Sequence, residues 1–245
     1  LYFIIMRKLS ILLSIYTLLL LTGCASTCME YRSATTAARS EKNLKRAEEF
    51  GLKALESPEC NPDTNAYAPY FLAIEVYRQQ KKYAKMAEML NLAEQRNPNQ
   101  PLETPFKLGD THVETIGEGV EAHREQEWMP VYNKAISLNE KGKLEKAKER
   151  IEVAMLIHPS RIENYTTLAI WYTEANDWEM ALNTIDRGLD INDENSDLYQ
   201  LKAEILLQNN PDISKMENAK ELYLIAIKYS DDPGPIMRKL LFVYI

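Results

Sequence analysis

The chain has 245 residues, 45% of them hydrophobic, which is enough apolar material for a sizeable core, so a disordered chain is not expected. It contains only 8 Gly and 11 Pro, so the composition favours helices over the short strands and tight turns of an all-β protein. The formal net charge of −7 argues against nucleic acid and anionic headgroups as partners, because an acidic surface repels them.

The N-terminus has the pattern of a secretory signal peptide. Met6 is the expected start, so residues 1–5 are read as upstream translation. Arg7 and Lys8 form a positive n-region, and the apolar run at residues 9–21 is too short to span a membrane as a helix. Residues 1–23 are therefore predicted to be a leader that is removed.

The leader ends in Leu-Thr-Gly-Cys at residues 21–24, which resembles the lipobox of bacterial lipoproteins. The resemblance implies a diacylglycerol on Cys24 and a lipid-anchored protein of the cell envelope. Ala25 and Ser26 lack the Asp that retains enterobacterial lipoproteins in the inner membrane, so the periplasmic face of the outer membrane is expected if the source is Gram-negative. The alternatives are an ordinary signal peptide with a chance cysteine, and an uncleaved membrane anchor.

Five segments share a ladder of large and small residues at spacings of 3, 4 and 3, which places each ladder on one face of a helix. Small rungs allow a neighbouring helix to approach closely, although Gly51 stands where a large residue is expected. The ladders are Leu44-Ala47-Gly51-Ala54, Tyr83-Met86-Leu90-Ala93, Leu144-Ala147-Ile151-Ala154, Trp178-Ala181-Ile185-Gly188 and Met216-Ala219-Tyr223-Ala226.

A second helix precedes each of the later four ladders, so each unit is predicted to be a helix-turn-helix. The third and fourth ladders begin 34 residues apart, and Pro98 and Pro159 follow the second and third at the same offset. This pattern resembles the tetratricopeptide repeat (TPR). The resemblance implies an all-α, right-handed superhelical solenoid, against the alternative of an ordinary helical bundle.

The repeats divide into an N-terminal pair at residues 24–98 and a C-terminal array at residues 128–245. Residues 99–127 break the pattern: Pro101 and Pro105 predict an extended connector, and Asp110 or Thr111 is expected to cap a following helix that Pro130 kinks or restarts. The end of the chain matches only the first helix of a sixth unit, so the array is expected to be truncated there.

Cys28 and Cys60 are a disulfide candidate. The register puts Cys28 at the start of the first helix and Cys60 just after the second, at the same end of an antiparallel pair. Two unrelated thiols are the alternative.

The sequence offers no constellation for catalysis, metal binding or a cofactor. His112, His123 and His158 lack the spacing of zinc ligands, and no nucleophile elbow or phosphate-binding loop occurs. His123 is expected to be solvated. The protein is therefore predicted not to be an enzyme.

In proteins that resemble this one, the first helices of successive units line a concave groove that binds peptides or a partner helix. Tyr132, Ile136 and Ile170 are expected to be solvent-facing there. The groove residues in this register are Phe71, Glu75, Arg78, Tyr132, Asn133, Ile136, Thr166, Ile170, Thr173, Gln200 and Glu204.

The function predicted from these features is a membrane-anchored scaffold of the bacterial cell envelope that binds other proteins or peptides. The alternatives are a lipoprotein that captures a glycan or peptide for an outer-membrane import complex, and an enzyme whose catalytic domain follows residue 245.

Overall fold

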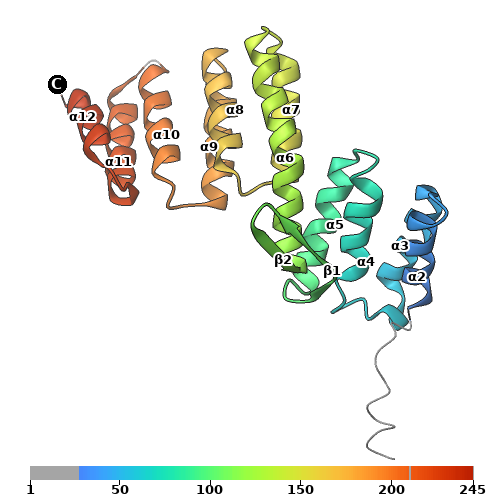
Figure 1. Ribbon diagram of the computed structural model, residues 1–245. Coiled ribbons are helices and arrows are strands. Elements are labelled where there is room, and N and C mark those ends of the chain that lie inside the picture. The colour runs from blue at the N-terminus through green and yellow to red at the C-terminus, as the bar shows by residue number, and fades with distance from the viewer. Residues whose placement is uncertain (1–27, 210, 245) are drawn as a thin grey trace, which may run out of the picture. The chain divides into compact units, whose positions relative to one another are not determined.

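The computed structural model describes residues 28–209 and 211–244, so the leader and Cys24 lie outside the described residues. The chain is mostly helical, and its helices pair as in a TPR solenoid (Figure 1). The helices are α2 (Met29–Arg39), α3 (Leu44–Glu56), α4 (Tyr67–Phe71) with a π-helical continuation (Leu72–Tyr77), α5 (Tyr83–Arg96), α6 (Ile116–Glu140), α7 (Leu144–Ile157), α8 (Ile162–Glu174), α9 (Trp178–Ile191), α10 (Ser196–Gln208), α11 (Ile213–Tyr229) and α12 (Gly234–Val243).

The chain forms two compact units. Of the described residues, unit 1 comprises 28–81 and Met89–Glu118, and unit 2 comprises Lys82–Glu88, 119–209 and 211–244. The division falls inside α5 and α6. The segment 99–127, expected to stand between two sets of repeats, is therefore shared between the two units.

Short polar residues begin several of the helices. Side-chain oxygens of Asn43, Asp177, Asn195 and Asp212 each accept a hydrogen bond from the backbone N–H three residues later, at 2.8 to 3.3 Å. Each cap satisfies a donor that has no partner inside its helix. The sequence thus fixes where α3, α9, α10 and α11 begin.

The small rungs of the ladders are buried and let helices approach closely. A Cβ on Gly51 would lie 2.5 Å from Cδ2 of Leu72, and one on Gly188 would lie 2.8 Å from Cδ1 of Leu198. Gly51 stands where a large residue was expected, and the Leu72 side chain fills the space beside it. Glycine at these two positions is required by the close approach.

Unit 2 is held together by apolar clusters that pass from one helix pair to the next. The larger cluster is centred on buried side chains such as Ile151, Leu168 and Ile185, and the second on Tyr223 and Ile236. Polar contacts recur at the repeat spacing: Trp128 binds Asn164, 36 residues away, and Arg187 binds Glu152, 35 residues away. Each helix pair therefore packs mainly on its neighbours in sequence.

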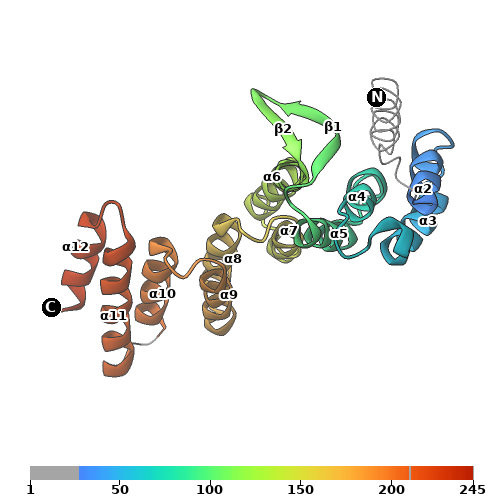
Figure 2. The same ribbon diagram turned by 90° about the horizontal axis from the view of Figure 1, so that it is seen from below.

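The segment expected to be a connector is a β-hairpin, so the all-α prediction needs this correction. Strands β1 (Pro101–Leu108) and β2 (Thr111–Thr115) pair antiparallel, with an irregularity between Pro101 and Phe106. Gly109, at a φ of 59°, and Asp110 form the two-residue turn. Figure 2 shows the hairpin as an arm beside the helices.

The helix after the hairpin also differs from expectation. It begins at Ile116, not after Asp110 or Thr111, and continues without a break through Pro130 to Glu140. His123, expected to be solvated, is buried on α6, and its Nδ1 lies 3.3 Å from Oε1 of Gln126.

Candidate functional site

The predicted groove residues of unit 2 lie on α6, α8 and α10, the first helices of its successive pairs. All of them keep some exposure: Tyr132, Asn133, Ile136, Thr166, Ile170, Thr173, Gln200 and Glu204. Ile170, at the middle of α8, is 42% exposed, which is unusual for a large aliphatic side chain. These positions form the surface that we call the A-helix surface.

Tyr132 and Ile136 are partly buried, contrary to the expectation that both face solvent. Both side chains pack against the larger apolar cluster. The Tyr132 ring lies 5.0 Å from that of Trp128, and its hydroxyl is 2.8 Å from Oγ1 of Thr167. Tyr132 thus joins α6 to α8 and contributes to packing as well as to the surface.

The threonine hydroxyls on α8 are engaged by their own helix. Oγ1 of Thr173 donates to the carbonyl of Ala169 at 2.8 Å, and Oγ1 of Thr166 lies 3.2 Å from the carbonyl of Glu163. A hydroxyl that donates locally still has lone pairs to accept another hydrogen bond. These side chains are therefore suited to accept from backbone N–H groups of a bound segment.

Charge on the A-helix surface is largely paired. Glu204 on α10 forms an ion pair with Lys239 on α12, 35 residues further along. The carboxylate that could have recognised a basic ligand is thus already neutralised. On α8, Ile170 lies between the uncharged Thr166 and Thr173, and the exposed Glu174 follows one turn later.

In unit 1 the three predicted groove residues differ in accessibility. Phe71 is only 3% exposed, with its ring edge-on to Tyr31 at 5.8 Å, so its assignment to an open groove is wrong. Glu75 and Arg78 are partly exposed, and Glu75 accepts from Arg39 at 3.1 Å. The structure therefore supports the A-helix surface in unit 2 more than a groove in unit 1.

A buried polar cluster in unit 2 was not anticipated. Trp128 Nε1 donates to Oδ1 of Asn164 at 2.8 Å, and the amide of Asn164 donates to the carbonyl of His158 at 3.1 Å. The guanidinium of Arg161 lies 4.9 Å from the Trp128 ring centre and pairs with Glu125. Trp128 and Asn164 are 36 residues apart, which is close to one repeat. This spacing is the sequence signal that could have located the cluster.

His158 lies at the centre of the cluster and is 1% exposed. Burial lowers the pKa of its imidazole; the nearby Glu121 and Glu125 act in the opposite direction, and Arg161 and Arg124 act with burial. Nε2 is 3.2 Å from a Glu121 oxygen but has no hydrogen-bonding geometry to it. His158 therefore serves as a neutral packing residue.

Unit 1 is closed by a disulfide between Cys28 and Cys60, whose Cα atoms are 4.6 Å apart. Among the described residues, the one trio of His, Cys, Asp or Glu side chains close enough to share a metal ion is Cys28, Glu30 and Cys60. Its sulfur atoms are bonded to each other, so they are not available as thiolate ligands. No helix in the described ranges is both long and apolar enough to span a bilayer.

Comparison with known proteins finds similarity in structure only. No family model matches the sequence, and no curated protein matches it. The first TPR of Spaghetti, solved with an HSP90 peptide, is 16% identical over 49% of this chain and 91% of its own, with a TM-score of 0.42. YrrB, a TPR protein with an unusual peptide-binding site, is 16% identical over 86% and 89%, with a TM-score of 0.37.

A third structure, Pseudomonas aeruginosa pilF, is 15% identical over 89% of this chain and 84% of its own, with a TM-score of 0.38. The pairing of helices described above is seen in the chain's own elements, α2 with α3 through α10 with α11.

Proposed function

We propose that the protein is a non-enzymatic scaffold of the bacterial cell envelope that binds a partner protein along the A-helix surface of unit 2. The observation that carries the proposal is Ile170, a large aliphatic residue left exposed at the centre of that surface. Tyr132 and Ile136 extend the apolar area on α6, since Tyr132 contacts Thr167 one turn before Ile170. An exposed apolar patch with a polar surround is typical of a protein-binding site.

The flanking polar residues favour an extended segment or a helix with few charges. Thr166 and Thr173 offer acceptors, and the charge of Glu204 is paired with Lys239. No cationic cluster that would clamp a terminal carboxylate lies among the residues of the A-helix surface. The partner is therefore recognised through apolar contacts and backbone hydrogen bonds.

Membrane attachment through Cys24 is part of the same proposal and rests on the sequence pattern alone. Multiple acyl chains on one cysteine provide stable anchoring where a single chain does not. A labelled fatty acid should be incorporated into the wild-type chain and not into Cys24→Ser. Equal labelling of both would remove the anchor.

The binding test compares Ile170→Ala with Leu156→Ala. Leu156 lies on α7, a second helix of its pair, and is 51% exposed, so it is a matched control. Loss of an apolar contact at the binding site should lower partner recovery by crosslinking in cells about 5- to 20-fold, whereas the control should not change it. Equal recovery for the two variants would show that the partner binds elsewhere.

A further inference from the structure

The turns inside four of the helix pairs share one backbone feature. Each contains a residue with positive φ: Lys42 at 54°, Lys81 at 55°, Gly142 at 68° and Asn176 at 60°. The residue after three of these donates its N–H back to the preceding helix, as when Asn43 binds the carbonyl of Ala37. The same left-handed turn thus closes helices α2, α6 and α8.

Lysine is unfavourable in this left-handed backbone conformation. Glycine adopts the left-handed region freely and asparagine is tolerated there, but other residues with a Cβ pay about 1 to 2 kcal/mol. Unit 2 has Gly142 and Asn176 in its turns, whereas unit 1 has Lys42 and Lys81. A strained residue that the fold does not require is a reason to look for a role of its side chain.

Both lysines belong to a concentration of positive charge. Six of the ten Lys and Arg residues described in unit 1 occur in or next to its two turns. We call this surface the basic edge, and its residues are Arg39, Lys42, Lys45, Arg46, Arg78 and Lys81. All except Arg78 are exposed, although the whole chain is acidic.

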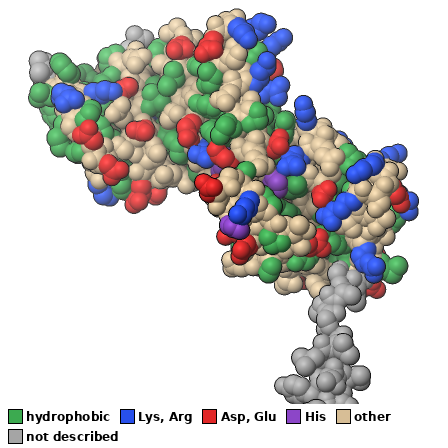
Figure 3. Space-filling model, viewed as in Figure 1, with side chains coloured by type: hydrophobic (Ala, Val, Ile, Leu, Met, Phe, Trp, Pro, Cys, Tyr) green, Lys and Arg blue, Asp and Glu red, His purple; other side chains and the backbone are tan. Residues whose placement is uncertain are grey.

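The two turns lie at the same end of unit 1 (Figure 1), and a contact links them. Nη2 of Arg39, at the end of α2, is 3.1 Å from Oε1 of Glu75 in the segment that leads to Lys81. Figure 3 shows Lys and Arg side chains gathered over the α2 and α3 end of the unit. Glu75 offsets the charge of Arg39, and Glu41 that of Arg46, so the local positive field of the edge comes mainly from Lys42, Lys45 and Lys81.

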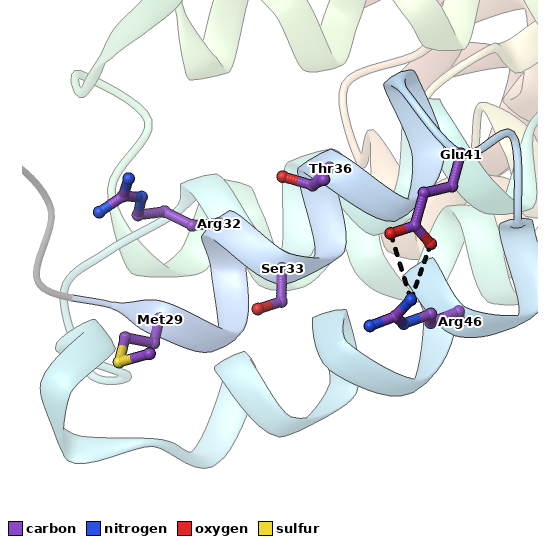
Figure 4. A pocket seen from close by; sticks show the side chains of 6 residues that line it. All are labelled: Met29, Arg32, Ser33, Thr36, Glu41 and Arg46. Carbon is purple, nitrogen blue, oxygen red and sulfur yellow. Dashed lines mark hydrogen bonds and ion pairs between the residues drawn. The ribbon is translucent and has the colours of Figure 1, made fainter.

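A hollow of about 350 Å³ on α2 and α3 adjoins the basic edge, and its mixed lining includes the Met29 side chain and the carboxylate of Glu41 (Figure 4). Arg32, Ser33 and Thr36 line it, and Arg46 is held at one side by both oxygens of Glu41, at 2.9 and 3.1 Å. These side chains include guanidinium and hydroxyl donors. The hollow thus adds directional hydrogen-bond donors to the charge of the turns.

We infer that the basic edge of unit 1 binds an acidic segment of a partner protein. Charge complementarity selects an acidic ligand, and the negative charge of the chain as a whole disfavours a long polyanion such as nucleic acid. A short acidic segment can contact the basic edge without lying against the acidic remainder of the surface.

An anionic membrane fits this geometry less well. Cys28 begins α2 at the end opposite the turn, and a helix of 11 residues is about 16 Å long. A lipid on Cys24, four residues earlier in the sequence, would bring headgroups to the end that carries Glu30 and Glu59. The basic edge would then point away from the membrane.

The test measures binding of fluorescein-labelled oligoglutamate to the full chain at low salt, by fluorescence anisotropy. The double variant Lys42→Asn/Lys81→Asn should bind about 5- to 10-fold more weakly, because two charges that act on the ligand are removed. Its thermal midpoint should stay equal or rise, since asparagine relieves the left-handed strain. Lys53→Gln/Lys107→Gln removes the same charge from exposed positions of unit 1 outside the edge and should retain binding.

Equal weakening in the two double variants would show that net charge alone is responsible, and would overturn the proposal. So would unchanged oligoglutamate binding by Lys42→Asn/Lys81→Asn, or binding of phosphatidylglycerol vesicles in place of oligoglutamate. Ile170→Ala should leave oligoglutamate binding unchanged, so this proposal and the function proposed for unit 2 can fail separately.

Discussion

The two units use different means to stabilise the same helix-turn-helix design. Unit 2 relies on a continuous apolar core and on contacts repeated one unit apart. Unit 1 adds a disulfide and a β-hairpin, and Tyr31 on α2 donates a hydrogen bond of 2.6 Å to Glu103 on β1. Covalent and polar links can thus stabilise one part of a helical array where stacked apolar contacts stabilise another.

The largest expected effect is loss of the disulfide, which should weaken unit 1 alone. Closing a loop between residues 32 positions apart contributes about 3 to 4 kcal/mol by chain entropy. Cys60→Ser should therefore lower the midpoint of urea unfolding for unit 1. All 3 tryptophans, Trp128, Trp171 and Trp178, lie in unit 2, so tryptophan fluorescence should report an unchanged transition while circular dichroism reports an earlier one.

Alkylation provides the control for this variant. In the unreduced wild-type chain the peptide that carries Cys60 should resist iodoacetamide, and after reduction it should be labelled. Labelling without reduction would contradict the bridge. A shift of the tryptophan transition in Cys60→Ser would show that the two units unfold together.

An intermediate effect is expected from filling the two glycine rungs. Gly188→Ala should destabilise unit 2 by about 1 to 3 kcal/mol, because the new Cβ meets Leu198 and the Cβ of Tyr165, which cannot rotate away. At Gly51 the added Cβ meets only the side chain of Leu72. Gly51→Ala should thus be partly rescued by Leu72→Val.

Denaturant titration of the four variants measures this difference. Leu198→Val should give little rescue of Gly188→Ala, since the contact with Tyr165 remains. If Leu198→Val fully rescued Gly188→Ala, the leucine side chain alone would limit the space at Gly188, as Leu72 does at Gly51. The two glycine positions would then be equivalent.

The smallest expected effect is a pH dependence confined to unit 2. Burial lowers the pKa of His158 below its ordinary value of 6.5, so the folded state holds the imidazole neutral while the unfolded chain takes up a proton. Stability from this residue is present above about pH 6.5 and decreases as the pH falls. His158→Gln should flatten the decrease in the tryptophan-detected midpoint between pH 7 and 5, and an unchanged slope would contradict the assignment.

The sequence predicted the repeats well because their signals are local. Ladder spacing depends only on helix geometry, and α3, α5, α7 and α9 each begin at the first residue of a ladder. The hairpin was missed because Pro101 and Pro105 were read as a connector. The turn Gly109-Asp110, with five-residue β2 after it, was the available signal.

The candidate site was harder to predict, because exposure depends on tertiary packing. Phe71 was assigned by counting back from a ladder in ordinary helical register, through a segment that is π-helical in the structure. A π-helical turn contains more residues than an α-helical one, so the count places residues on the wrong face. The exposure of Tyr132 was overestimated because its side chain packs on Trp128 of the same helix and on Thr167 of α8. The second contact depends on how two helices pack together.

The contact between Tyr31 and Glu103 has a kinetic consequence. It joins residues 72 apart, about twice the separation of the contacts described in unit 2. Bringing distant residues together costs loop entropy before any contact repays it, and chains with nearer contacts reach the native state faster. Helix pairs of unit 2 should therefore acquire hydrogen-exchange protection early during refolding, one after another, while α2 and the hairpin become protected together and later.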